Sequence, residues 1–204
     1  KEAFNIMEKV RKGKGVTEER VQLMKDNNVP DWYIESCQRI KYMFPRAHAV
    51  AYVMMSYRIA WFKVYYPVPF YAAYFTTKVA DFNSEVVLKG SGAILARIDE
   101  ILAKGKNATK KEEDEMTVLE VAYEMYSRGY EFEPINFGVS DGTKFYEHEG
   151  RVLLPFMAVS GIGETAAKAL ADECRIRPFE TIEELKSRTR ISNSNIESLK
   201  AMGV

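Results

Sequence analysis

Apolar residues recur at helical spacing along most of the chain, and glycine or proline separates the periodic stretches. This pattern predicts helices at 3–12, 17–27, 31–42, 47–66, 70–77, 84–103 and 108–128. The helix at 47–66 is apolar on nearly every face, which predicts burial by several neighbours. The helix at 84–103 carries one apolar stripe, formed by Val87, Ile94, Ile98 and Ile101.

Between residues 130 and 154 the pattern changes to short aromatic and branched runs. These runs are separated by the turn residues Ser140-Asp141-Gly142 and Glu149-Gly150, so we expect a small β-hairpin there. Residues 155–204 return to short helices. The fold class is therefore predicted to be mainly α, with a helical module, a small β-hairpin and a second helical module.

Composition allows a folded core, since 47% of the 204 residues are hydrophobic. The formal net charge is zero, but lysine and arginine number 14 against 9 acidic residues in 1–89, 7 against 13 in 90–150 and 8 against 7 in 151–204. The net charge thus gives no sign of a nucleic-acid partner. Much of the acidic surplus falls on the helix at 108–128, whose acidic face we expect to be solvated.

The two cysteines favour neither a metal site nor a disulfide. Cys37 and Cys174 lie far apart, and no histidine or second cysteine stands near either at ligand spacing. A reducing cytosol fits this usage best, and we expect a cytoplasmic protein. The most apolar stretch, 47–62, contains His48, Ser56 and Arg58, which favours a buried helix over a membrane span.

A glycine-bent corner has the clearest chemistry in the chain. Residues 159–170 place Gly161-Ile162-Gly163 directly before a helix of small residues, which has the form of a helix-hairpin-helix motif. The glycines allow a tight turn, and the free N–H groups at the start of the helix can receive a phosphate. Such contacts are independent of base sequence. The candidate DNA-binding residues are Ser160, Gly161, Ile162, Gly163, Thr165 and Lys168.

The alternative is a tight turn between packed helices, with Ile162 as a core residue. Glu164, beside the corner, argues against strong phosphate binding by this hairpin alone. The segment 181–203 repeats the helix-turn-helix rhythm without the glycine pair, so we expect it to support the first hairpin by packing and to contact DNA weakly.

Three stretches carry a resemblance to a known family: residues 41–52, which are Lys-Tyr-Met-Phe-Pro-Arg-Ala-His-Ala-Val-Ala-Tyr, residues 6–15 and residues 156–163. They resemble the bacterial C-family replicative DNA polymerases of the PolC type, and the first two are similar to segments of the fingers of that family. Residues 156–163 occupy the place of the family's helix-hairpin-helix. The resemblance runs through essentially the whole chain in the correct order, and three ordered motifs are more specific than one.

The resemblance gives roles to two basic segments. Arg46, His48 and Tyr52 open a helix and can face a common site, where charge suits a triphosphate and a ring suits stacking on a base. Arg11, Lys12 and Lys14 are candidates for contact with template or nucleotide phosphate, although a basic glycine loop is more often solvated. Without the resemblance, Tyr52 would be interpreted as a core residue and His48 as a satisfied helix-end residue.

The implied organisation has three parts: distal fingers at 1–135, a small β element at 136–154 and a duplex-binding helix-hairpin-helix region at 155–204. The implied partners are primer-template duplex DNA, the incoming deoxynucleoside triphosphate and the remainder of the polymerase chain, comprising palm, thumb and upstream fingers. In the cell, the implied setting is the replisome. No membrane partner is expected.

The departures from a complete polymerase limit the expected activity. Polymerases of this class need palm carboxylates that hold two metal ions. None of the aspartates in this chain falls in a matching motif. They include Asp31, Asp81, Asp99, Asp141 and Asp172. We therefore expect no catalytic residue, no metal site and no cofactor in this chain, which would be an inactive fragment of a polymerase whose palm holds magnesium.

Two rival functions remain at this point. The first is a free-standing helix-hairpin-helix module of a repair or recombination protein, in which residues 1–140 are scaffold and the chain alone binds DNA appreciably. The second is a metabolic enzyme with a site around His48 and His148. Two histidines without metal spacing or a phosphate loop make the second weak.

Overall fold

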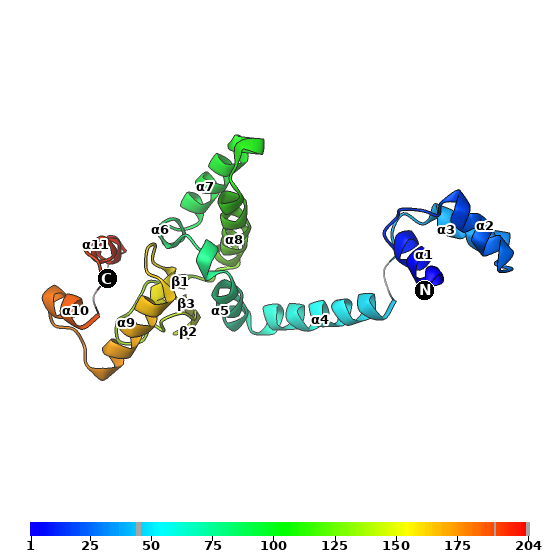
Figure 1. The fold of residues 1–204 in the computed structure, drawn as a ribbon. Coiled ribbons are helices and arrows are strands. Elements are labelled where there is room, and N and C mark those ends of the chain that lie inside the picture. Colours follow the sequence, from blue (N-terminus) through cyan, green and yellow to red (C-terminus); the bar gives the residue numbers. More distant parts are fainter. Residues whose placement is uncertain (44–45, 190, 203–204) are drawn as a thin grey trace. The chain divides into compact units, whose positions relative to one another are not determined.

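The computed structural model describes residues 1–43, 46–189 and 191–202 (Figure 1). By their internal contacts, the residues form two compact units, Lys1–Arg58 and Ile59–Val204. The described part of the chain contains eleven α-helices and one small three-stranded sheet. This confirms the prediction of a mainly α fold with a small β element.

The first unit packs three short helices around a small core. These are α1 (Glu2–Arg11), α2 (Glu18–Asp26) and α3 (Asp31–Arg39), and the unit also holds the first part of α4 (Arg46–Tyr65). Helix α1 ends where the sequence becomes Gly-Lys-Gly, as predicted. The core consists of Ile6, Val10, Met24, Ile34 and Cys37.

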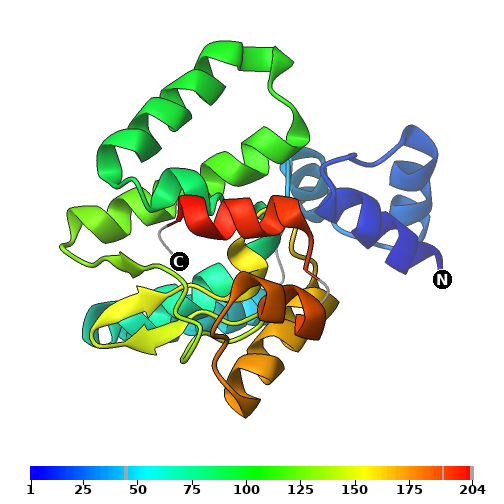
Figure 2. The same cartoon turned by 90° about the vertical axis from the view of Figure 1, so that its left-hand side faces the viewer.

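The second unit is built on a single core that runs from α5 to the C-terminal helices. Its α-helices are α5 (Pro67–Thr77), α6 (Ser84–Val87), α7 (Ser91–Lys104), α8 (Lys110–Ser127), α9 (Glu164–Ile176), α10 (Ile182–Thr189) and α11 (Asn193–Ala201). Three 3-10 turns join them: η1 (Val79–Asp81), η2 (Gly105–Asn107) and η3 (Phe156–Ala158). Helices α7 and α8 form an antiparallel pair (Figure 2).

The division by contacts differs from the three functional parts expected from the sequence. Phe75 of α5, Leu119 of α8 and Ile162 of the glycine corner belong to the same buried cluster, so no packing boundary falls at residue 135 or 154. Parts of a chain with different functions can share one hydrophobic core. The functional boundaries therefore remain a prediction.

The sheet contains the predicted hairpin and one further strand. Strands β2 (Tyr146–His148) and β3 (Arg151–Leu153) pair antiparallel, with Glu149 and Gly150 at positive φ in the turn between them. Strand β1 (Phe132–Glu133) pairs parallel with β3, which gives the order β1-β3-β2. The hairpin prediction is confirmed, but β1 lies before the expected element at 136–154.

The prediction of a single helix at 84–103 is wrong, because the segment forms two helices. Gly90 adopts φ +90°, a conformation that no helix interior allows, and it separates α6 from α7. Asn83 caps the short α6 by accepting a hydrogen bond from the Val86 amide at 3.2 Å. The predicted stripe of Val87, Ile94, Ile98 and Ile101 is nevertheless buried.

Helix α4 extends over the predicted range, but its expected burial is wrong. None of its described residues is buried, and its large apolar side chains are exposed. Apolar periodicity shows what a helix surface is suited to contact, and it does not show which segment supplies the contact.

The acidic face of α8 is not simply solvated, because one of its carboxylates is buried. Glu115 is 8% exposed and accepts hydrogen bonds from Arg97 on α7, at 2.9 and 3.2 Å, and from Asn83 at 2.7 Å. Burial raises the pKa of Glu115, but the hydrogen bonds from Arg97 and Asn83 lower it more, so the pKa lies below 4.5. The ion pair between Arg97 and Glu115 therefore joins α7 to α8.

Replacing Glu115 with glutamine should destabilise the second unit most at neutral pH. A carboxylate with a depressed folded pKa stabilises the fold above its unfolded pKa, and that contribution is lost as pH falls through the folded value. The variant should lose about 1–3 kcal/mol of unfolding free energy at pH 7, and the difference should shrink below pH 4.5. Denaturant unfolding followed by circular dichroism at several pH values measures this. Glu113→Gln, an exposed neighbour paired only with Lys110, is the control and should cost less than about 0.5 kcal/mol.

Candidate nucleic-acid interface

The glycine corner is formed by residues 159–163 and leads directly into α9. Gly161 adopts φ +83°, which a residue with a side chain adopts only with strain, and a Cβ there would lie 2.8 Å from Asn195 Nδ2. Gly163 is the N-cap of α9 and has an ordinary extended conformation. The two glycines therefore serve different purposes, since Gly161 makes the turn and Gly163 keeps the helix start uncovered.

The corner presents unpaired amides on its outer side. Among the described residues, no acceptor is found for the amides of Gly161, Gly163, Glu164 and Thr165, and all four residues are exposed. Ile162 differs, because its side chain is buried and its amide donates to Val159 O at 3.1 Å. The corner therefore directs the positive end of α9 outward, an arrangement suited to a phosphate, while Ile162 holds the turn to the core.

Lys168 is less available to a phosphate than the sequence suggests. Its Nζ lies 2.6 Å from Glu164 Oε1, and both side chains are exposed. The hydrogen bond with Glu164 raises the pKa of Lys168 and lowers that of Glu164, so both groups stay charged at neutral pH. Exposed pairs of this kind are weak and screened by salt. A phosphate arriving at the corner would compete with Glu164 for this lysine.

The second helix-turn-helix segment packs against the first, because Ile196 and Leu199 of α11 share a buried cluster with Ile162, and one of its asparagines also reaches the glycine corner. Ser192 caps α11 by accepting a hydrogen bond from the Asn195 amide at 3.2 Å, and Asn195 Nδ2 donates to Ser160 O at 3.3 Å. The predicted support by packing is thus seen. Sequence reasoning missed Asn195, because only the fold brings it to the glycine corner.

The basic turn at 11–15 packs against the segment that precedes α4. A Cβ on Gly13, which adopts φ +70°, would overlap the carbonyl oxygen of Lys41, and the Met43 amide donates to Arg11 O at 3.0 Å. Lys41 thus joins the basic turn, although its sequence position gives no sign of the contact.

The three basic residues of that turn are not equivalent. The side chains of Arg11 and Lys12 both pair with Glu8, at 2.9 and 3.3 Å. Lys14 forms no ion pair with any residue that the structure describes. Of the three candidates, Lys14 is therefore the one whose charge is least compensated.

The structure brings two of the three residues at the start of α4 together. The rings of His48 and Tyr52 lie one helical turn apart, with centroids 4.2 Å from each other and planes inclined by 46°. Both are exposed. Arg46 begins the helix two residues before His48, and residues two apart do not face each other. Its long side chain would have to reach round the first turn to join them.

The described part of the chain shows no candidate metal cluster and no candidate membrane span. No group of three or more histidine, cysteine or acidic side chains is placed to hold a metal ion there. His148 Nδ1 lies 2.9 Å from Glu133 Oε2, and His148 belongs to the second compact unit whereas His48 belongs to the first. None of the helices in the described ranges is long and apolar enough to cross a membrane.

Comparison with known proteins finds a match to the helix-hairpin-helix motif and several relatives that match along the whole chain. A helix-hairpin-helix motif family matches residues 129–204. PolC-type DNA polymerases III from Caldanaerobacter subterraneus, Clostridium perfringens and Thermotoga maritima are 54%, 49% and 48% identical over 98%, 100% and 99% of this chain. Over its whole length, the chain is homologous to PolC-type DNA polymerase III.

The resemblance to the PolC type inferred from three motifs is therefore confirmed. The chain spans 14–15% of the length of these polymerases. The match to PolC-type polymerases includes residues 1–128, which lie outside the helix-hairpin-helix match. This argues against the rival in which the first part of the chain is only a scaffold for a free-standing DNA-binding module.

Proposed function

We propose that this chain is the part of a PolC-type replicative DNA polymerase that contacts the incoming nucleotide and holds the product duplex. The observation that carries the proposal is the exposed glycine corner, whose unpaired amides open α9, in a chain homologous throughout to these polymerases. Residues 1–135 would act as distal fingers and residues 155–204 as the duplex grip.

The duplex would be held through its phosphate backbone. Amides of Gly161, Gly163, Glu164 and Thr165 would donate to phosphate oxygens, without reading base sequence. Lys168, the lysine one turn into α9, already pairs with Glu164. The chain alone would therefore bind duplex weakly, and tight binding would need the palm and thumb of the intact enzyme.

The nucleotide would be met at the start of α4. The ring of Tyr52, with His48 beside it, would stack on a base, and Arg46 would approach the triphosphate. Lys14 would meet template or nucleotide phosphate. The carboxylates and magnesium ions that perform phosphoryl transfer would lie elsewhere in the polymerase chain.

In the full polymerase, Gly163→Ala should weaken duplex binding by about tenfold, because the added methyl group lies where a phosphate would approach the amides. Apart from the adjoining residues, no atom of the described residues lies within 4 Å of that Cβ position, so the fold should be unchanged. Since no charge is removed, the salt dependence of binding should keep its slope. Fluorescence anisotropy with duplexes of two unrelated sequences, at several salt concentrations, measures both effects.

Gly92→Ala is the matched control, because Gly92 is also exposed at a helix start with open space around its Cβ position. It should bind duplex as the unaltered polymerase does. Equal affinities of the Gly163→Ala and Gly92→Ala polymerases would remove the corner from the duplex interface.

The chain of 204 residues should incorporate no nucleotide into a primed template with magnesium present. The proposal places the metal-binding carboxylates outside this chain. Primer extension, with a purified full-length polymerase as the positive control, measures incorporation. Extension that follows the 204-residue chain through purification would contradict the proposal.

A further inference from the structure

Helix α4 exposes large apolar side chains along its whole length. Its only ionisable side chains are three basic residues, one histidine and the tyrosines, and no acidic residue occurs in it. Contiguous apolar surface of this kind marks an interface. Tyr52 of this helix is assigned above to the nucleotide. The other exposed large apolar residues are Val50, Val53, Met54, Met55, Tyr57, Ile59, Trp61, Phe62, Val64 and Tyr65.

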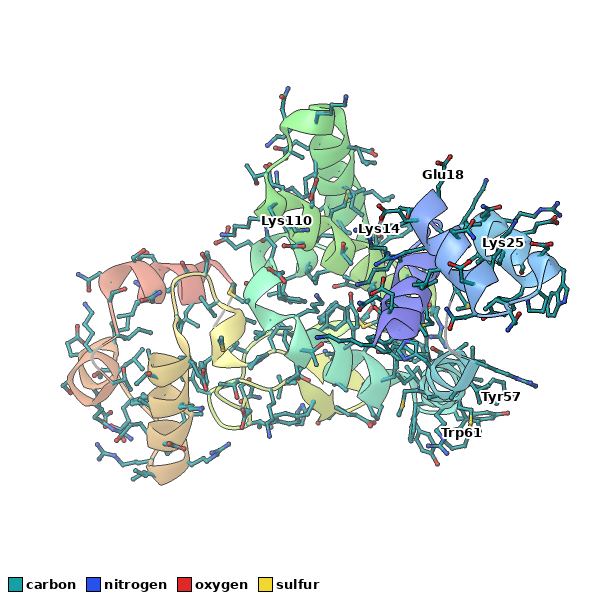
Figure 3. All side chains as sticks on the ribbon, turned by 45° about the vertical axis from the view of Figure 1, so that its right-hand side comes forward. Lys14, Glu18, Lys25, Tyr57, Trp61 and Lys110 are labelled. Carbon is teal, nitrogen blue, oxygen red and sulfur yellow. The ribbon has the colours of Figure 1, made fainter. Side chains whose placement is uncertain are left out.

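The aromatic side chains of α4 are already arranged as interface anchors. Tyr57, Trp61 and Tyr65 follow one another at intervals of four residues and so share one side of the helix, and Tyr57 and Trp61 project from it in Figure 3. The Trp61 ring lies 5.0 Å from Tyr65 and 5.2 Å from Phe62, centroid to centroid. Tryptophan and tyrosine are the residues that most often dominate binding energy at interfaces.

The last turn of α4 is held in place by polar contacts, which leaves the apolar faces free. Lys63 Nζ lies 2.9 Å from Glu124 Oε2 on α8, and Arg128 Nη2 donates to the carbonyl oxygen of Lys63 at 3.0 Å. Arg128 and Glu124 also hydrogen-bond the hydroxyl of Tyr71, at 2.8 and 2.6 Å. The end of the helix is therefore fixed without using Tyr57, Trp61 or Tyr65.

We propose that α4 is a docking surface for the polymerase chain outside residues 1–204. The relatives continue for most of their length beyond the matched 14–15%, so covering chain is available. A helix that is apolar all round needs neighbours on several sides. A twofold dimer would cover one side only, because each copy presents the same patch to the other. This inference rests on the proposed function only in placing the chain within a longer polymerase.

The test uses the full-length polymerase with a photo-crosslinking amino acid, p-benzoylphenylalanine, at Tyr57, which is 77% exposed here. Irradiation without DNA or nucleotide should join this position to peptides of the same polymerase chain outside residues 1–204, as identified by mass spectrometry. The control carries the crosslinker at Lys110, which is equally exposed but charged and paired with Asp114. That position should yield no such peptide.

Three outcomes would overturn the proposal. They are a crosslink to a second copy of the polymerase, no crosslinked peptide at all, and equal crosslinking from Tyr57 and Lys110. None of them depends on DNA or nucleotide binding. Failure of the docking surface is therefore distinguishable from failure of the duplex and nucleotide roles, which Gly163→Ala and Tyr52→Ala report.

Discussion

In the full polymerase, Tyr52→Ala should raise the apparent KM for the incoming nucleotide by about ten- to a hundredfold, while duplex affinity stays nearly unchanged. Stacking of a base on an aromatic side chain contributes about 1–3 kcal/mol, which corresponds to this range. The Tyr52 ring is 65% exposed and lies 4.2 Å from the His48 ring, so it is free to receive a base on its open side. Steady-state incorporation with varied nucleotide concentration measures KM, and anisotropy measures duplex affinity.

Two control variants separate the ring from its surroundings. Tyr52→Phe keeps the ring and removes the hydroxyl, so the KM for nucleotide should remain near that of the unaltered enzyme. Tyr33→Ala removes another exposed tyrosine, on α3, and should change neither quantity. A larger loss of duplex affinity than of nucleotide affinity in Tyr52→Ala would place this residue on the DNA instead.

The helices that the sequence predicted well are those with a one-sided apolar pattern and strong end signals. Val87, Ile94, Ile98 and Ile101 were expected on one stripe and are buried together. The break within 84–103 was missed because glycines within a periodic stretch, here Gly90 and Gly92, do not by themselves end a helix. Only the φ of +90° at Gly90 shows that two helices meet there.

Pairing and burial depend on partners that are distant in sequence, and there the predictions failed. Strand β1 contains two residues, too few for any alternating pattern, and it exists because β3 pairs with it. Glu115 looks like a member of a solvated acidic face, but Arg97 across the α7–α8 pair takes it out of water. For α4, the pattern indicated a buried helix, and none of its described residues is buried.

The glycine corner could be recognised because its chemistry is local. The turn, the cap and the free amides all arise within residues 159–165, and the motif family matches the region. Asn195 could not be recognised, since it reaches Ser160 only after α9, α10 and α11 have packed. Lys41 is similar, because its carbonyl oxygen meets Gly13 across two intervening helices of the chain.

A second large effect is expected from replacing Gly13, which packs against Lys41. Gly15 offers a matched control for this substitution. Gly13 and Gly15 adopt similar left-handed conformations, with φ of +70° and +65°. A Cβ on Gly15 would meet nothing within 4 Å, whereas a Cβ on Gly13 would overlap the backbone of Lys41. Alanine at either position costs about 1–2 kcal/mol in backbone strain, and only Gly13→Ala adds a steric clash of about 1–3 kcal/mol.

The expected result of Gly13→Ala is separation of the basic turn from Lys41, because a backbone oxygen cannot move aside as a side chain can. The Met43 amide, which donates to Arg11 O at 3.0 Å, should then exchange with solvent about ten- to a hundredfold faster. Hydrogen exchange of peptides covering residues 38–43 measures this, and Gly15→Ala should keep Met43 protected.

The same pair of variants tests whether the basic turn serves the polymerase. If Lys14 meets template or nucleotide phosphate only when the turn is packed against Lys41, then Gly13→Ala should lose affinity for one of these ligands and Gly15→Ala should retain it. Faster exchange at Met43 with unchanged affinity for both ligands would make the turn a structural feature of the first unit. Protection of Met43 in both variants would contradict the packing itself.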